Sequence, residues 1–143
     1  MTDRLDIRLV NDLSEIPRLA EAVDAFFDER GLPPALAFHF NLALDELLTN
    51  VFSYAFPEGG RHEVAVSLAV DDGFVVAELI DDGTPFDPLT DAKPPVLEGD
   101  IDERPIGGLG IHFVKSMMDS VRYERHDGRN RLTLTKRAAA DDP

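Results

Sequence analysis

The sequence predicts an α+β fold, a two-layer α/β sandwich in which a mainly antiparallel sheet carries helices on one face. Four of the expected strands form two pairs joined by short turns, which favours antiparallel neighbours. Two helical segments precede the first pair, and a third lies between the two pairs. The chain has 143 residues, 43% of them hydrophobic, so we expect a single domain over residues 1–143.

The N-terminal part of the chain is expected to form a strand and two helices. Residues 4–10 alternate between apolar and polar side chains, the pattern of a half-buried strand. Polar residues at 11–14 can cap a first helix, whose apolar spacing continues to Gly31. A second helix is expected to open at Pro33 and Pro34, since proline is tolerated in the first turn, and to run to about Ala55.

The middle of the chain is expected to form a hairpin followed by a long lid. Residues 64–70 alternate, Asp72 and Gly73 form a turn, and residues 74–80 return as the second strand. The segment 82–106 then holds five prolines and many acids, with no periodicity. So long a stretch without secondary structure is typical of a functional lid or a disordered segment.

The C-terminal part is expected to add one helix and two strands. A glycine-rich segment, 107–110, leads into an apolar helix over about 111–118. Strands follow at 121–125 and 131–135, and the tail 138–143 is expected to be disordered.

Composition excludes several classes of function. The 28 Asp and Glu against 14 Lys and Arg give a net charge of −14, and the pI is near 4.5, which disfavours binding to nucleic acid or to a membrane surface. The absence of cysteine excludes disulfides, thiolate catalysis and cysteine-ligated metals. There is no apolar run for a signal peptide or a membrane span, so a cytoplasmic protein is expected. The four histidines show no ligand spacing and are expected to be structural or exposed: His39, His62, His112 and His126.

Glu46 and Asn50 form the first candidate site. They are four residues apart on the second predicted helix, so both side chains lie on one face, one turn apart. An amide oxygen is a suitable ligand for Mg²⁺, and a carboxylate can orient or deprotonate a hydroxyl group. Taken alone, the pair is equally compatible with a solvated helix face.

Asp81 and Gly83 form the second candidate site, at the end of the hairpin. Asp81 continues the apolar face of Val75, Ala77 and Leu79, where a charge is costly unless it has a partner. Its oxygens could accept a hydrogen bond from the exocyclic amine of adenine. Gly83 would allow close approach of a ring or of backbone. The alternative is an ordinary turn rich in Asp and Gly.

The glycine-rich segment forms the third candidate site. Gly107, Gly108, Leu109 and Gly110 precede a helix, whose N-terminal N–H groups attract phosphate. The segment lacks the Lys-Ser/Thr pair of a P-loop and does not have the G-x-G-x-x-G spacing. A simple loop-to-helix junction remains the alternative.

The order of these three motifs resembles that of the GHKL ATPases, which share the Bergerat ATP-binding fold, and within them the anti-sigma-factor serine/threonine-protein kinases of the RsbW/SpoIIAB type. The similar motifs are ELLTN at 46–50, DDGTPFDP at 81–88 and GGLGI at 107–111. Met117-Met118-Asp119 replaces the usual Leu-Met-Asp, a conservative change. The resemblance covers about residues 5–136.

This resemblance implies a role for each motif. Asp81 would accept from the adenine amine, and Gly83 would leave room for the base. Asn50 would coordinate Mg²⁺, and the segment 107–110 with the helix after it would hold the phosphates of ATP. Glu46 would be the catalytic residue that orients or deprotonates the attacking hydroxyl. Lys93 and Arg104 of the lid could also reach phosphate, although solvated charges are the simpler interpretation.

The resemblance also implies partners. The substrate would be a serine or threonine of a STAS-domain anti-anti-sigma factor, a sigma factor would be the competing partner, and the protein could form a homodimer. A non-enzymatic module that binds ATP and a protein partner is the main alternative, although Glu46 argues against it. The catalytic domain of a sensor histidine kinase is disfavoured, because the chain has no phospho-acceptor helix hairpin.

Overall fold

A computed structural model describes residues 4–91 and 107–138 of the chain. The strands are β1 (Arg4–Val10), β2 (Glu63–Asp71), β3 (Phe74–Asp81), β4 (Ser120–His126) and β5 (Arg129–Arg137). The helices are the short 3-10 helix η1 (Leu13–Glu15) and the α-helices α1 (Ile16–Glu29), α2 (Pro34–Tyr54), α3 (Pro88–Asp91) and α4 (Gly107–Met117). None of the described helices is both long and apolar enough to cross a lipid bilayer.

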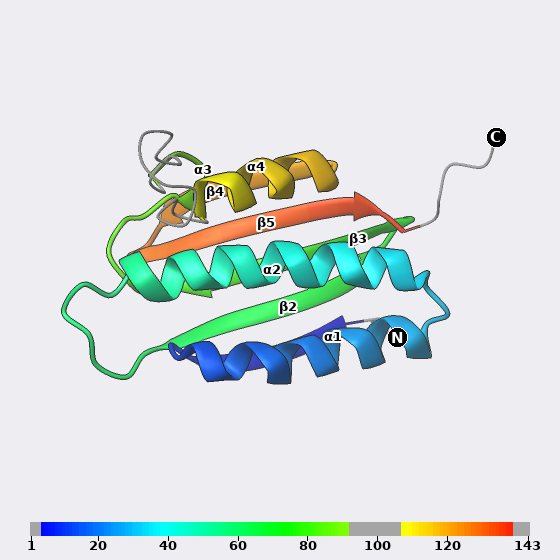
Figure 1. Cartoon of the computed structure of the whole chain (residues 1–143), viewed down its shortest axis with the longest axis horizontal. Helices are drawn as coiled ribbons and strands as arrows, with labels where there is room; N and C mark the ends of the chain where they lie inside the picture. The colour runs from blue at the N-terminus through cyan, green and yellow to red at the C-terminus, as the bar shows by residue number, and fades with distance from the viewer. Residues whose placement is uncertain (1–3, 92–106, 139–143) are drawn as a thin grey trace, which may run out of the picture.

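The five strands form one sheet in the order β1-β2-β3-β5-β4, with every neighbouring pair antiparallel. Helices α1, α2 and α4 lie side by side over one face of this sheet, with α2 in the middle (Figure 1). The predicted α+β fold, with helices on one face of an antiparallel sheet, is therefore confirmed.

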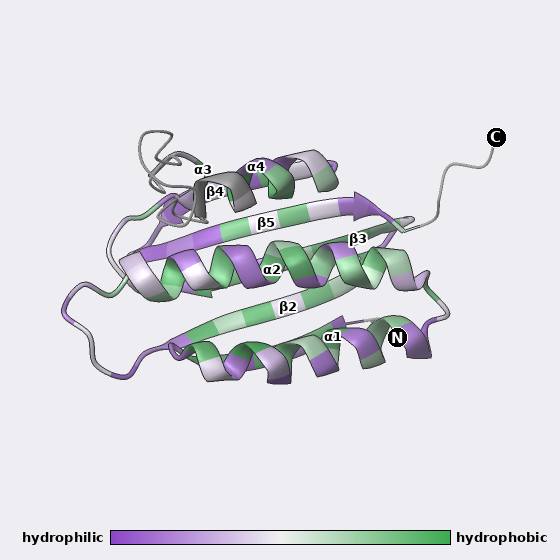
Figure 2. Cartoon of the chain, in the orientation of Figure 1, coloured by the Kyte–Doolittle hydropathy of each residue, from purple (hydrophilic) through white to green (hydrophobic). Residues whose placement is uncertain are grey.

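The core lies between the two layers, and the strand alternation explains its position. Val64, Val66 and Leu68 of β2 are buried, whereas the residues between them are only half-buried. Along α2, buried side chains such as Phe40, Leu44 and Leu47 pack against this face of the sheet. Figure 2 shows the corresponding hydrophobic colouring along β2 and over much of α2. This packing fixes α2 over the centre of the sheet.

The free edge of β1 is covered by two side chains from the start of the helical layer. Glu15 accepts from the backbone N–H of Val10 at 2.9 Å, and Arg18 donates to the carbonyl of Arg8 at 2.7 Å. Glu15 and Arg18 also form an ion pair at 3.0 Å. Occupied edge groups of this kind limit pairing with strands of other molecules.

The predicted lid differs from the structure at its beginning. The segment 82–106 was expected to lack secondary structure, which is wrong for residues 88–91, because they form α3. The carboxylate of Asp87 accepts from the N–H of Leu89 at 2.9 Å, and Pro88 occupies the first helical position. Residues 92–106, with Lys93 and Arg104, lie outside the described residues.

Two boundaries in the C-terminal part also differ from the sequence prediction. The glycine-rich segment was expected to precede its helix, but α4 begins at Gly107, so residues 107–110 form the first turn. Ala138 was placed in a disordered tail, but its N–H donates to Gly73 at 2.8 Å and extends the sheet by one contact. Residues 139–143 lie outside the described residues.

Candidate functional site

Glu46 and Asn50 contact each other as their helical spacing predicts. The Asn50 amide nitrogen donates to the Glu46 carboxylate at 2.7 Å and to the Glu46 carbonyl at 2.8 Å. Asn50 is 4% exposed, so these bonds satisfy a buried amide N–H group. The amide oxygen of Asn50 has no partner among residues 4–91 and 107–138 and remains available to a ligand.

The first turn of α4 packs directly against Glu46. A methyl group on Gly110 would overlap the Glu46 carboxyl group, so a larger residue at this position would require the Glu46 side chain to move. The structure therefore brings together Glu46 and Asn50 of α2 and the N-terminal turn of α4, which lie about sixty residues apart in sequence. Of Gly107, Gly108 and Leu109 the structure describes the helical backbone only.

Asp81 ends β3 and is buried, 4% exposed, on the face that carries Val75, Ala77 and Leu79. Its Oδ1 accepts from the N–H of Gly83 at 2.8 Å, which closes a tight turn. Its Oδ2 has no hydrogen-bond partner in the described part of the chain. One carboxylate oxygen is thus held by the protein, and the other is available to a donor from a ligand.

Gly83 allows two backbone segments to meet. A side chain on Gly83 would overlap the carbonyl oxygen of Ala55, at the end of α2, and would lie 2.9 Å from Oδ1 of Asp81. The next residue, Thr84, donates its N–H to the same Ala55 carbonyl at 2.9 Å. The sequence interpretation expected a ring or backbone to approach this glycine, and in the structure the backbone of Ala55, which follows α2, does so.

Asn130 is a site residue that the sequence analysis missed. It is 2% exposed on β5, directly opposite Asp81 in the strand register, and donates to Asp81 Oδ1 at 2.9 Å. The alternation of β5 could have indicated that Asn130 is buried, because it continues the buried face of Leu132 and Leu134. Asp81 continues the buried face of β3 in the same way. The strand was expected to begin at Arg131, two residues after the start of β5, which hid this relation.

The two carboxylates of the site share an electrostatic property. Burial raises the pKa of Glu46, while the hydrogen bond from Asn50 acts in the opposite direction. Burial likewise raises the pKa of Asp81, opposed by the hydrogen bonds from Asn130 and Gly83. A raised pKa makes a carboxylate a stronger proton acceptor and a stronger hydrogen-bond acceptor.

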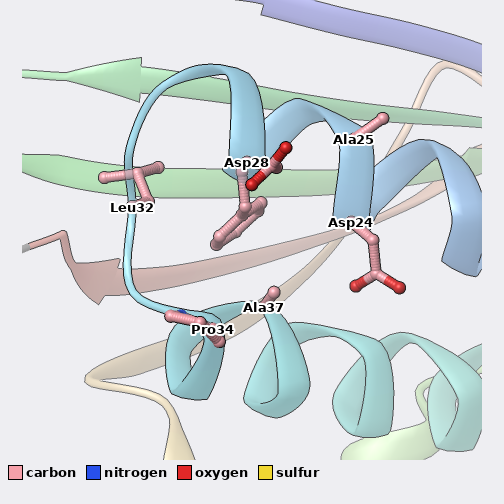
Figure 3. Close-up of a pocket in the computed structure, with 7 residues that line it drawn as sticks. Asp24, Ala25, Asp28, Leu32, Pro34 and Ala37 are labelled. Atoms are coloured by element: carbon pink, nitrogen blue, oxygen red, sulfur yellow. The ribbon is translucent and has the colours of Figure 1, made fainter.

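Two further features of the described chain concern metal-ligating groups and a cavity. Nowhere in it do three His, Asp or Glu side chains gather in a group suited to hold a metal ion. A cavity of about 400 Å³ lies between the end of α1 and the start of α2, where Asp24 and Asp28 line it (Figure 3). It contains none of the predicted site residues.

Comparison with known proteins gives results in agreement with this geometry. Residues 9–136 match the family model described as the histidine kinase-like ATPase domain. BtrW, a serine/threonine-protein kinase of Bordetella bronchiseptica, is 34% identical over 106 residues, which make up 74% of this chain and 74% of BtrW. RsbW, a serine-protein kinase of Bacillus subtilis, is 29% identical over 90 residues, 61% of this chain but only 56% of RsbW.

A solved structure supports the fold. The structure of the RsbU and RsbW domains of Rv1364c from Mycobacterium tuberculosis superimposes with a TM-score of 0.66 at 18% identity. The match covers 94% of this chain and 32% of that one. At this level of identity the likeness concerns the fold alone.

Proposed function

Because the chain belongs to the histidine kinase-like ATPase domain family, we propose that it is an ATP-dependent protein-serine/threonine kinase that acts as an anti-sigma regulatory factor. Its substrate is a serine or threonine of a STAS-domain anti-anti-sigma factor, and a sigma factor binds in the competing complex. The named kinases among its relatives support the reaction class. The partners follow from the family resemblance.

The single observation that carries the kinase proposal is the position of Glu46. Its carboxylate lies against the first turn of α4, where helix N–H groups favour the phosphates of a nucleotide. Burial raises the pKa of Glu46, which makes its carboxylate a stronger proton acceptor. A module that only binds ATP has no need of a half-buried carboxylate at this point.

The reaction that these residues support is a balanced phosphoryl transfer. The serine or threonine oxygen forms a bond to the γ-phosphorus as the bond from that phosphorus to the β–γ bridging oxygen breaks. The hydroxyl proton passes to the Glu46 carboxylate, and ADP leaves with the bridging oxygen. Most of the rate enhancement in such transfers comes from positioning and from neutralisation of charge.

The donor set fits a magnesium ion bound mainly by the nucleotide. Mg²⁺ commonly takes one or two protein oxygens and fills its other positions with phosphate oxygens and water. The amide oxygen of Asn50 is unengaged among the described residues and lies beside Glu46. The amide oxygen of Asn50 would hold this metal, which would supply neutralisation of phosphate charge.

The experiment that tests the proposal is transfer of labelled γ-phosphate from ATP to a STAS-domain protein of the same organism. We expect Mg²⁺-dependent labelling of one serine or threonine and no labelling when that residue is replaced by alanine. ATP binding without labelling of the STAS protein would identify a non-enzymatic binding module instead. Absence of ATP binding would refute the proposal entirely.

A further inference from the structure

We infer that Asn130 is the positioning residue of the nucleotide site: it fixes the Asp81 carboxylate so that Oδ2 faces the base, and it joins that carboxylate to the loop after β3. This inference rests on the proposed function for the identity of the ligand. The arrangement of the side chains themselves is independent of it.

The amide nitrogen of Asn130 has two acceptors that define its place. It donates to Asp81 Oδ1 at 2.9 Å and to the carbonyl of Thr84 at 2.8 Å. Since Asp81 Oδ1 also accepts from Gly83, this oxygen holds two donors from the protein. The carboxylate can then rotate only by breaking both bonds, so Oδ2 stays directed away from β5.

The amide oxygen of Asn130 faces three donors. It accepts from the N–H of Phe86 at 3.3 Å, from the hydroxyl of Tyr123 at 2.5 Å and from the guanidinium of Arg125 at 3.1 Å. With acceptors on one side and donors on the other, only one orientation of the amide satisfies the network. Neither an aspartate nor an aliphatic side chain can reproduce this pattern.

Asn130 therefore couples the base-binding carboxylate to the start of the predicted lid. Thr84 and Phe86 belong to the segment between β3 and α3, and Arg125 also donates to the carbonyl of Gly83 at 2.8 Å. The segment 81–86 and the hairpin of β4 and β5, which are distant in sequence, thus meet at a single side chain. Loss of this amide disturbs both the orientation of Asp81 and the path of residues 82–87.

The first test replaces the amide of Asn130 by a carboxylate. The charged and titratable groups that face Asp81 in the described chain are Asp82 beside it and Arg125 and Tyr123 on β4. In Asn130→Asp, a second carboxylate adjoins Asp81, and the two repel unless they share a proton. We expect at least a tenfold weaker affinity for ATP than wild type at pH 8 and a smaller deficit at pH 6, measured by calorimetry.

Asn41→Asp is the matched control. Asn41 of α2 donates to the carboxylate of Asp24 on α1 at 3.0 Å, so this variant makes the same chemical change in an exposed pair outside the site. Its ATP affinity should stay within about twofold of wild type at every pH. An Asn130→Asp variant with wild-type affinity and no added pH dependence would overturn the inference.

A second pair of variants keeps the test valid if Asn130→Asp does not fold. These variants are Asn130→Thr and Asn130→Val. Threonine and valine have the same shape as each other and both suit a strand, but only threonine can donate to Asp81 Oδ1. A hydrogen bond to a charged group is stronger than one between neutral groups, so its loss should lower the affinity for ATP measurably. We expect the valine variant to bind ATP at least about tenfold more weakly than the threonine variant. Equal affinities would show that Asn130 serves packing alone.

An NMR titration of the Asp81 carboxyl carbon separates this inference from the proposed function. We expect Asn130→Asp to raise the apparent pKa of Asp81 above its wild-type value, whether or not nucleotide is present. If the wild-type protein does not bind ATP, the proposed function fails, while this titration still decides the inference. An unchanged pKa of Asp81 would contradict it.

Discussion

Two pairs of an asparagine and a carboxylate define the two ends of the site, and they differ in how the chain brings them together. Asn50 donates to Glu46 at 2.7 Å within one turn of α2. Asn130 donates to Asp81 at 2.9 Å, from β5 to β3, across 49 positions of sequence. Burial raises the pKa of the carboxylate in both pairs. The same local chemistry therefore arises once from helix periodicity and once from strand register.

The difference assigns separate tasks to the two ends. The Glu46 end lies against the first turn of α4, where a phosphate would bind, and under the proposed function its carboxylate would act in the transfer step. The Asp81 end is enclosed by the sheet and by the turn at Gly83, and under the proposed function its free oxygen would recognise the base. Variants at the Glu46 end should accordingly change the rate of transfer, whereas variants at the Asp81 end should change the affinity for the nucleotide.

The largest expected effect is on the rate of transfer in Glu46→Gln. Glutamine keeps the shape and can still contact Asn50 but cannot take a proton, so the rate at saturating ATP should fall by about 10²–10⁴. In the wild type, the rate should rise with pH through the pKa of Glu46, which lies above its ordinary value of 4.5. A pH–rate profile of both proteins measures this, and a variant of near wild-type rate would assign the proton transfer to another group.

The next largest effect is on the choice of base in Asp81→Asn. Loss of a buried acceptor costs roughly 1–3 kcal/mol, or about 5–150-fold in affinity. The variant should also lose its preference for ATP over GTP, because guanine has a carbonyl where adenine has an amine. Calorimetry with both nucleotides tests this, and an unchanged ratio of the two affinities would place the base elsewhere.

A smaller effect is expected at the amide of the first pair. Asn50→Ala removes one oxygen that can hold Mg²⁺, so the increase in ATP affinity that Mg²⁺ gives to the wild type should disappear. Binding of ATP in EDTA should be little changed. Thermal unfolding checks the fold, since Asn50 is buried. A variant that unfolds would show that this amide is mainly structural.

Gly110→Ala tests whether α4 must contact Glu46 closely. The added methyl group would meet the Glu46 carboxyl group, so either the carboxyl group or the helix must move. Alanine favours a helix over glycine by about 1 kcal/mol, so stability alone would improve. We expect slower transfer with a similar or higher melting temperature, whereas wild-type transfer would show that the contact has no role in the reaction.

The smallest effect lies outside both pairs, at the edge of β1. Hydrogen bonds from Arg18 and Val10 lower the pKa of Glu15 from 4.5 to about 2. Its contribution to stability is then present above about pH 4.5 and is lost as the pH falls towards 2. Wild type should melt above Glu15→Gln at pH 6, and the difference should shrink by pH 3. A constant difference would exclude ionisation of Glu15 as its cause.

The sequence predicted those parts of the site that depend on local periodicity. The i,i+4 spacing placed Glu46 and Asn50 on one face, and the strand alternation placed Asp81 among buried apolar residues. No spacing predicts that Asn130 faces Asp81, because that depends on the register between β3 and β5. The short helix α3 was missed because the prolines of its segment concealed the capping role of Asp87.

The division of tasks between the two ends is the central claim, and one measurement tests it most directly. Single-turnover phosphorylation of the STAS-domain substrate would be followed against ATP concentration for wild type, Asp81→Asn and Glu46→Gln. We predict that Asp81→Asn raises the half-saturating concentration and leaves the plateau rate within a few-fold of wild type. Glu46→Gln should lower the plateau and leave half-saturation unchanged. Two variants that shift both quantities by the same factors would contradict the claim.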